Sequence, residues 1–382
     1  MNYCTTLLLS LGFIYNTSAQ TVPEISLHDK IGQMLIIGFN GKTVNGQSPI
    51  VKSIEKDNIG GVILFDYNYQ TQTFGKNIES PKQVKTLNHD LQRAVFQANL
   101  KLHRPQLPLL ISVDYEGGNV ARLSEQYGFP KTTSPATIGK GSGEKAIIAA
   151  KAMASTLKQT GFNLNFAPML DVKVNPKNPI IAKKGRSFSS DPGVVTRFAE
   201  IYSKQFLRQN IQCVYKHFPG HGSSTTDSHL GFVDVTTTWH SNELIPYQRL
   251  IPSKNSCGVI MSAHIVNRQL DDSGLPATLS YKILTGLLRN KLKFKGLIVT
   301  DDLQMKAISE QYGLEKSIVL AINAGADILI FGNNLRVKAQ DPSKIIAIVE
   351  KNIKAGKISI SRIEESYYRI SKLKSELETN SN

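Results

Sequence analysis

The sequence predicts an α/β protein in which a (β/α)8 TIM barrel forms a single domain. Short runs rich in apolar and β-branched residues recur eight times along the 382 residues. The runs are almost continuously apolar, which is typical of parallel strands buried on both faces. Segments with helical spacing separate them, and strand–helix alternation implies parallel crossovers. An open doubly wound sheet is the alternative, but a count of eight units favours the closed barrel.

The expected elements follow one another along the chain. We expect strands at residues 32–39, 60–65, 107–114, 162–172, 211–217, 258–264, 296–301 and 326–332. We expect helices at residues 81–100, 143–161, 192–210, 281–293 and 304–324. These elements leave no room for a second domain, so the barrel is expected to span residues 20–374. The polar tail, residues 375–382, is expected to fray from Ser375.

The N-terminus has the pattern of an export signal. The apolar run at residues 7–15 is too short to span a bilayer. Small residues at Thr17 and Ala19 suit signal-peptidase cleavage before Gln20. We therefore expect residues 1–19 to be a signal peptide and the protein to be exported, either to the periplasm or outside the cell. No Lys or Arg precedes the run, so a buried N-terminal strand or helix is the alternative.

Composition narrows the class of protein. Hydrophobic residues make up 41% of the chain, which is enough for a sizeable core and excludes a disordered protein. The net charge of +15 favours anionic partners, such as nucleic acid, acidic envelope polymers or a membrane surface, without choosing among them. Three cysteines exclude a disulfide-built small fold. Cys4 would leave with the signal, and we expect Cys213 and Cys257 to be buried free thiols rather than a pair.

Polar residues are concentrated where the expected strands end, the place where such barrels carry their chemistry. In chain order these residues are Asp114, Glu116, Arg122, Asp171, Arg186, Lys216, His217, His221, Asp227, His229, His264, Asp301 and Asp302. Helix capping could explain any one of them, for example Asp301 or Asp302 before a helix near Gln304. Capping is a poor explanation for polar residues at five strand ends on one rim.

Three chemistries could use this rim. Metal-assisted hydrolysis would take His217, His221, Asp227 and His229 as ligands. Glycoside hydrolysis would need a carboxylate nucleophile and a separate proton donor. Non-catalytic binding of an anionic polymer would use the basic surface. Lys216 would place a cation beside the metal and the histidine spacing is irregular, so the residues argue against metal. The other two possibilities remain open.

Four motifs narrow the choice. The sequence reads KHFPGHG at residues 216–222, DSH at 227–229, VTDDLQM at 299–305 and DYEGG at 114–118. Together, and in their order along the chain, which begins with DYEGG, they resemble glycoside hydrolase family 3. Within it the chain is similar to the single-domain bacterial β-N-acetylhexosaminidases that remove terminal N-acetylglucosamine from peptidoglycan fragments. The resemblance covers residues from about 31 to about 370.

The resemblance implies a role for each residue that matches the family. Asp301 matches the nucleophile of a retaining enzyme, His229 the general acid/base and Asp227 its partner. The residues that match sugar-binding positions are Asp114, Arg122, Arg186, Lys216, His217 and His264. The resemblance implies no cofactor and no metal. Expected partners are N-acetylglucosamine-containing oligosaccharides or muropeptides, with no nucleic acid and no transmembrane segment after signal removal, and we expect a monomer.

Some features depart from the family pattern. Tyr115 stands where Gln is usual, which we expect to alter the pocket wall next to the sugar. The Pro often found after the acid/base is missing after His229. A phosphorylase or a β-glucosidase of the same family remains an alternative activity. A non-catalytic protein that binds cell-wall polymer is the alternative of a different class.

Overall fold

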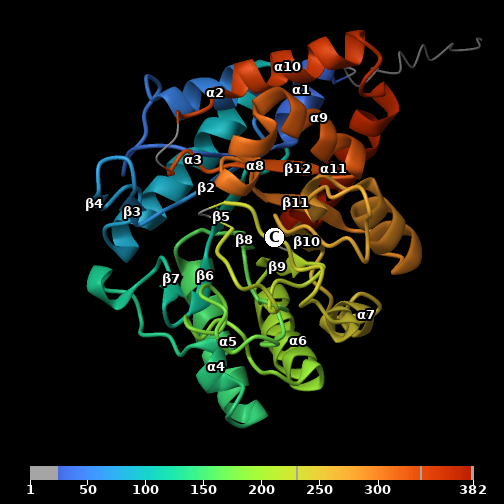
Figure 1. The fold of residues 1–382 in the computed structure, drawn as a ribbon. Helices are drawn as coiled ribbons and strands as arrows, with labels where there is room; N and C mark the ends of the chain where they lie inside the picture. Colours follow the sequence, from blue (N-terminus) through green and yellow to red (C-terminus); the bar gives the residue numbers. More distant parts are fainter. Residues whose placement is uncertain (1–24, 229–230, 336–337, 380–382) are drawn as a thin grey trace, which may run out of the picture.

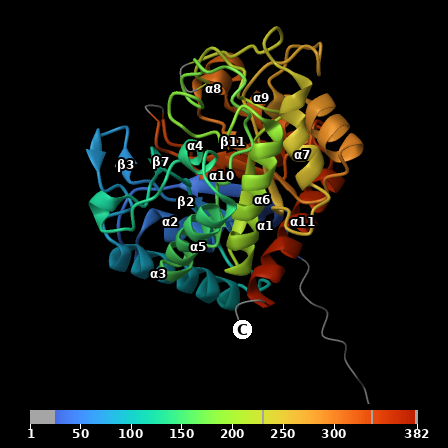
Figure 2. The same ribbon diagram turned by 90° about the horizontal axis from the view of Figure 1, so that it is seen from below.

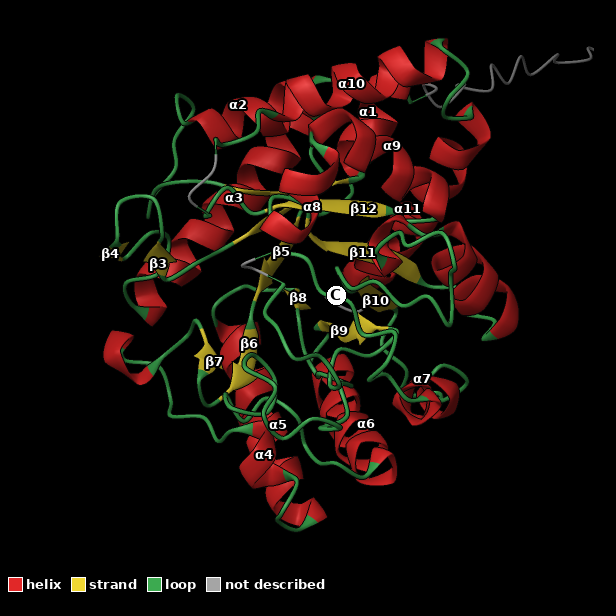
Figure 3. Cartoon of the chain, in the orientation of Figure 1, coloured by secondary structure: helices red, strands yellow, loops and turns green. Residues whose placement is uncertain are grey.

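The structure, a computed structural model, describes residues 25–228, 231–335 and 338–379. Its centre is a closed barrel of parallel strands in the order β1-β12-β11-β10-β9-β8-β5-β2 (Figures 1 and 3). The strands are β1 (Leu35–Gly38), β2 (Gly61–Ile63), β5 (Leu110–Val113), β8 (Leu164–Asn165), β9 (Gln212–Phe218), β10 (Val259–Ser262), β11 (Leu297–Asp302) and β12 (Ile328–Phe331). Each falls on one of the eight expected runs, so the predicted (β/α)8 barrel is confirmed.

Helices surround the barrel, and α5 and α6 pack side by side (Figures 1 and 2). The α-helices are α1 (Leu27–Gln33), α2 (Pro49–Asp57), α3 (Pro81–Lys101), α4 (Pro135–Ile138), α5 (Gly143–Gln159), α6 (Pro192–Arg208), α7 (Ile245–Leu250), α8 (Lys306–Tyr312), α9 (Leu314–Ala324), α10 (Pro342–Lys354) and α11 (Ile360–Thr379). A π-helix, η4 (Lys282–Lys291), occupies the fourth expected helix. Two small hairpins lie outside the barrel sheet: β3 (Tyr67–Asn68) with β4 (Thr73–Phe74), and β6 (Tyr115–Gly117) with β7 (Val120–Ala121).

Local sequence fixes where several helices begin. Ser80, Ser142 and Asp191 each accept a hydrogen bond from a backbone N–H in the first turn of α3, α5 and α6. One expected helix differs, because residues 304–324 form two helices instead of one. Gly313 separates α8 from α9 with a φ of 68°, a backbone conformation that glycine adopts without a steric penalty.

The C-terminal helix extends beyond its expected end. α11 continues through Ser375 to Thr379, so the expectation of a frayed tail from Ser375 is wrong as far as Thr379. Leu373 and Leu377, four residues apart on the helix, are buried against the core, and Asn210 Nδ2 donates to Leu377 O at 2.7 Å. The apolar face of α11 therefore holds residues 375–379 in place, although their composition is mostly polar.

Cys213 and Cys257 form a disulfide, which corrects the expectation of two free thiols. Cys213 lies on β9, and Cys257 precedes β10, the parallel neighbour of β9. The barrel thus brings the two Cα atoms to 5.0 Å although 44 positions separate them in the sequence. The strand pairing, which spacing in the sequence does not reveal, decides the state of the thiols.

The expected signal peptide, residues 1–19, lies outside the described residues. Among the helices that the structure describes, none combines the length and the apolar composition that crossing a bilayer requires.

Candidate active site

Lys216 lies near the C-terminal end of β9, between two carboxylates. Its Nζ is 2.8 Å from Asp114 Oδ1 and 2.7 Å from Glu116 Oε1, and its side chain is 2% exposed. Asp114 and Glu116 are alternate residues of an extended segment, so their side chains point the same way. Burial by itself would lower the pKa of Lys216, but the two carboxylates together raise it. The ammonium group is therefore held in its charged form.

Arg186 binds the other side of Glu116. Its Nε donates to Glu116 Oε2 at 2.8 Å and its Nη2 to Glu116 Oε1 at 2.7 Å, a bidentate geometry. Nη1 donates to Ile180 O at 3.2 Å. Burial opposes the charge on Glu116, yet Arg186 and Lys216 hold its pKa well below its usual range. Arg186 is thus fixed by three hydrogen bonds.

Asp114, Lys216, Glu116 and Arg186 form a line of charges that alternate in sign, which we call the charge array. The charges sum to zero, and each buried member has a partner of opposite sign, which offsets the cost of removing it from water. Asp114 is the outermost member, with its side chain 21% exposed compared with 1% for Glu116. The structure brings together three residues predicted to bind sugar, and it adds Glu116.

His217 is oriented by a buried carboxylate. Its Nδ1 lies 2.7 Å from Asp171 Oδ2, so an Nδ1–H donates there and Nε2 is the ring atom that can contact a sugar. Asp171 Oδ1 accepts from the backbone N–H groups of His217 and His221 at 3.3 and 2.8 Å. Burial opposes the charge on Asp171, but contact with His217 and His221 lowers its pKa overall. Asp171 therefore holds the loop after β9 and the His217 ring together.

His221 is buried within the same loop and contacts two of its serine hydroxyl groups. Its Nδ1 is 2.9 Å from Ser224 Oγ and its Nε2 is 3.2 Å from Ser228 Oγ. Burial lowers the pKa of His221 to about 4, although Asp171 and Asp301 act in the opposite direction. The ring is neutral at neutral pH. The effect of Asp301 also shows that the ends of β9 and β11 lie within electrostatic reach of each other.

Glu243 packs against the KHFPGHG loop and accepts a hydrogen bond from it. Its Oε2 accepts from Gly222 N at 2.9 Å, and Trp239 Nε1 donates to Pro219 O at 3.3 Å. Gly220 has a φ of 119°, and a Cβ there would lie 2.6 Å from Glu243 Cβ. Burial raises the pKa of Glu243 to about 8. The approach of Glu243 to Gly220 therefore leaves no room for a side chain at position 220.

Asp301 and Asp302 end β11, and they have different surroundings. Asp301 is partly exposed, and its Oδ1 accepts from Asp302 N at 2.8 Å. Asp302 Oδ1 accepts from Gln304 N at 3.0 Å, which is a turn-capping contact. His264 is buried behind this strand end: its Nε2 donates to Asp302 O at 2.9 Å, and its Nδ1 lies 2.8 Å from Thr278 Oγ1. His264 therefore holds the backbone of Asp302 at the end of β11.

Of the remaining expected site residues, Arg122 and Asp227 lie within the part of the chain that the structure describes. Arg122 contacts Asp66 Oδ1 through Nη1 at 3.4 Å, and its guanidinium lies 5.9 Å from the centre of the Phe65 ring. Asp227 is half-buried in the loop that His221 braces. His229, the expected acid/base, lies outside the described residues. Within the described part of the chain, no three His, Cys, Asp or Glu side chains form a group that could hold a metal ion.

Tyr115 does not form the wall next to the sugar, so that expectation is wrong. It lies between Asp114 and Glu116 in β6, and alternation along an extended segment turns its side chain to the opposite face. The ring is buried near α5, outside the charge array. Its backbone N–H donates to Asn165 Oδ1 at 3.1 Å and its carbonyl accepts from Asn165 Nδ2 at 3.0 Å. Asn165 therefore fixes the segment that presents both carboxylates.

Comparison with known proteins agrees with this geometry. Residues 26–373 match the glycosyl hydrolase family 3 N-terminal domain. The chain belongs to this family. It is 34% identical to "Beta-hexosaminidase A" of Pseudoalteromonas piscicida, over 95% of this chain and 63% of that protein. It is 32% identical to "Beta-hexosaminidase LpqI" of Mycobacterium tuberculosis strain H37Rv, over 70% of this chain and 68% of that protein.

Solved structures of family 3 proteins superpose on most of the chain. A family 3 β-N-acetylglucosaminidase from Paenibacillus sp. strain FPU-7 aligns with a TM-score of 0.82 and 32% identity, over 94% of this chain and 64% of that one. A β-N-acetylhexosaminidase from Beutenbergia cavernae aligns with a TM-score of 0.79 and 25% identity, over 92% of this chain and 99% of that one. This family 3 chain thus spans just under two thirds of the Pseudoalteromonas and Paenibacillus proteins.

Three carboxylates of this family 3 site were not assigned roles from the sequence. Glu116 had a usable signal, because it lies two residues after Asp114 and extended residues two apart share a face. Asp171 was recognised as the end of a strand, but its contact with His217 spans 46 positions. Glu243 is outside every motif and lies within a short 3-10 helix, Ser241–Leu244, which gives no functional signal.

The raised pKa of Glu243 predicts a pH-dependent stability that Glu243→Gln removes. Its folded-state pKa of about 8 exceeds the ordinary value of 4.5, so the fold favours the protonated form. The stabilisation is complete below pH 4.5 and is lost as the pH rises through 8. Urea unfolding at pH 5 to 9 should show wild type losing on the order of 3 kcal/mol more than Glu243→Gln. Parallel pH profiles for the two proteins would contradict the prediction.

Proposed function

We propose that this chain is a retaining exo-β-N-acetylglucosaminidase. In this proposal it hydrolyses the terminal, non-reducing N-acetylhexosamine of peptidoglycan or chitin fragments through a covalent glycosyl-enzyme. The observation that carries the proposal is the position of Asp301 at the end of β11, on the same barrel rim as the charge array. Relatives named β-hexosaminidase and β-N-acetylglucosaminidase support the choice of sugar.

The chemistry assigned to Asp301 follows from its carboxylate and its place. A carboxylate oxygen attacks the anomeric carbon and the bond to the leaving oxygen breaks, which forms a glycosyl ester. His229 gives a proton to the leaving oxygen, then takes one from the water that hydrolyses the ester, and so returns to its starting state. Asp227, two residues earlier in the chain, would hold the imidazole and stabilise its charged form.

The charge array supplies the groups that recognise the sugar. Asp114 is the partly exposed carboxylate and can accept hydrogen bonds from two sugar hydroxyls. Lys216 and Arg186 can donate to hydroxyls or to the acetamido carbonyl, and their partners already fix them in place. Preformed donors and acceptors of this kind lose little conformational entropy when a sugar binds.

Variants at the proposed catalytic residues should have distinct kinetic effects. Asp301→Ala should lower kcat on the 4-nitrophenyl β-N-acetylglucosaminide by roughly three orders of magnitude or more. Asp302→Asn should retain activity, because an Asn oxygen still caps Gln304 N.

His229→Ala should slow the hydrolysis of substrates with poor leaving groups by about 10²–10⁴-fold and spare activated aryl glycosides. The measurement is kcat across a leaving-group series, with circular dichroism as the control for folding.

Four outcomes would contradict this assignment. Equal loss of activity in Asp302→Asn would remove the distinction between the two carboxylates. Equal rates on the β-glucoside would remove the sugar specificity and favour a β-glucosidase, and faster turnover with added phosphate would favour a phosphorylase. Retention on cell-wall material with no turnover of either glycoside would favour a non-catalytic binding protein.

We also propose that the protein is exported. The short apolar run followed by Thr17 and Ala19 supports cleavage before Gln20. The Cys213–Cys257 disulfide is of a kind that persists mainly in oxidising compartments. The net charge of +15 suits contact with anionic envelope polymers. N-terminal sequencing of the native protein should find a start at or near Gln20, and an intact Met1 on cytoplasmic material would contradict export.

A further inference from the structure

Asn178 is fully buried in the loop that joins β8 to α6, and its amide group contacts two segments of the barrel rim. Its Oδ1 accepts hydrogen bonds from the backbone N–H groups of Ile180 and Ile181, at 3.0 and 2.9 Å. These two residues hold Arg186, because Arg186 Nη1 donates to Ile180 O at 3.2 Å and Arg186 N donates to Ile181 O at 3.0 Å. The oxygen of Asn178 therefore supports residues 180–186, which we call the Arg186 turn.

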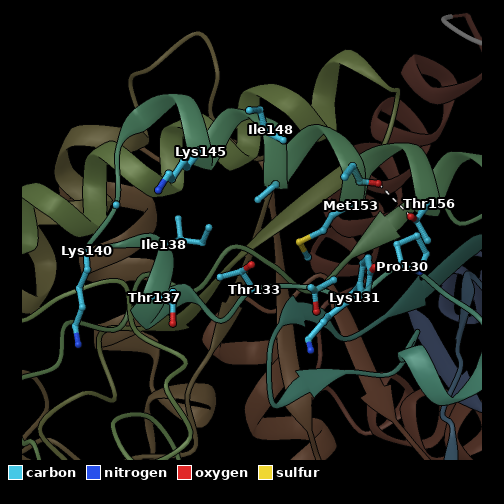
Figure 4. Close-up of a pocket in the computed structure, with 15 residues that line it drawn as sticks. Pro130, Lys131, Thr133, Thr137, Ile138, Lys140, Lys145, Ile148, Met153 and Thr156 are labelled. Carbon is cyan, nitrogen blue, oxygen red and sulfur yellow. Dashed lines mark hydrogen bonds between the residues drawn. The ribbon is translucent and has the colours of Figure 1, made fainter.

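The Arg186 turn has limited packing of its own. Its two isoleucines pack with Met169 in a small apolar cluster, separate from the large one that fills the barrel and its helices. Gly185 O accepts from Ala136 N at 3.0 Å, and the residues after Ala136, Thr137 and Ile138, line a cavity of about 670 Å³ (Figure 4). Burial stabilises a segment in proportion to the apolar area removed from water. The position of this turn therefore depends strongly on its hydrogen bonds.

The nitrogen of Asn178 holds a different segment, at the end of the KHFPGHG loop. Nδ2 donates to His221 O at 2.9 Å and to Ser224 Oγ at 3.0 Å, and Gly222 O lies 3.3 Å away. A side-chain amide can accept on one side and donate on the other, whereas an ionised carboxylate only accepts. The amide of Asn178 therefore joins the Arg186 turn to residues 221–224.

The segment after β9 continues directly to the proposed acid/base. Ser224 Oγ donates to Thr226 O at 3.3 Å, and His221 Nε2 lies 3.2 Å from Ser228 Oγ. Thr226 and Ser228 are the chain neighbours of Asp227, the proposed partner of the acid/base. Hydrogen bonds that start at the buried amide therefore reach both neighbours of Asp227.

We propose that Asn178 is a positioning residue that couples recognition of the sugar to the placement of the acid/base. This inference rests on the proposed function, because it takes Arg186 as a sugar ligand and Asp227 as the partner of His229. A shift of the Arg186 turn is passed through one amide group to the residues on either side of Asp227. Because its side chain is fully buried, Asn178 acts through these two segments and not by contact with the sugar.

Two substitutions separate the two sides of the amide. Asn178→Ala removes both sets of hydrogen bonds. Asn178→Asp keeps an oxygen that accepts from the two isoleucine N–H groups, but it replaces the donor that faces residues 221–224 with a second acceptor. Calorimetry with N-acetylglucosamine should show an affinity about three- to tenfold weaker in Asn178→Ala, and within about twofold of wild type in Asn178→Asp.

The effect on the acid/base can be measured apart from sugar affinity. The substrates are the 2,4-dinitrophenyl and 4-methoxyphenyl β-N-acetylglucosaminides, which carry the same sugar, so sugar affinity cancels in the ratio of their kcat/KM values. Only the 4-methoxyphenyl group needs a proton to leave. The ratio of activated to unactivated substrate should rise about tenfold in both variants, because both lose the donor to residues 221–224. Asn178→Asp also carries this test if Asn178→Ala does not fold.

Asn88→Ala is the matched control. Asn88 is a buried asparagine on α3, and its Nδ2 donates to Thr160 O at 2.8 Å, away from the two segments that Asn178 joins. This variant should lower the free energy of unfolding and leave both the ratio and the affinity for N-acetylglucosamine unchanged. A merely structural role for Asn178 would give the same pattern in Asn178→Ala.

Hydrogen exchange supplies a readout that does not depend on catalysis. Backbone amides of residues 181–186 and 221–224 should both exchange faster in Asn178→Ala than in wild type. Faster exchange in only one segment would overturn the inference, as would an unchanged kcat/KM ratio in Asn178→Ala beside a raised ratio in His229→Ala. Absence of turnover by wild type would instead contradict the proposed function, and the exchange result would still decide whether Asn178 joins the two segments.

Discussion

The ammonium group of Lys216, buried between two carboxylates, is the constraint on which the rest of the site depends. A buried charge is tolerated when groups of opposite charge are next to it, and Asp114, directly after β5, and Glu116, in β6, supply them. Glu116 in turn requires Arg186, which Ile180 O also holds. One buried cation thus fixes the positions of groups from three separate segments of the barrel rim.

The KHFPGHG loop also buries titratable groups beside it, and these groups differ in whether they are charged or neutral. Asp171 remains ionised because it contacts His217 and two backbone N–H groups. Glu243 has fewer compensating contacts, and burial raises its pKa to about 8. His221 is kept neutral by burial. Each buried titratable group beside the KHFPGHG loop is charged or neutral according to the partners that it contacts. Together these groups hold His217 and Lys216 at the rim.

Periodicity predicted the eight strands, and motif order predicted the family and most of the rim, because both depend on neighbouring residues in the sequence. Contacts between segments that are far apart in the sequence could not be predicted from either signal. The Cys213–Cys257 pair depends on the pairing of β9 with β10, and the place of Leu377 depends on the packing of α11. Tyr115 could have been placed correctly, since it alternates with Asp114 and Glu116 in an extended segment. A departure from the family motif does not by itself place a side chain at the sugar, and the Tyr115 side chain faces the opposite side of β6 from the two carboxylates.

A double-mutant cycle between Lys216 and Glu116 tests most directly whether the charge array acts as one unit. Lys216→Met leaves the array with a net charge of −1 and Glu116→Gln leaves it at +1, whereas the double variant is neutral again. Each single variant should lower the free energy of unfolding by about 3–5 kcal/mol. The double variant should lose less than the sum of the two, by about 2 kcal/mol or more. Losses that add within about 0.5 kcal/mol would show that the two residues act independently and would contradict the account.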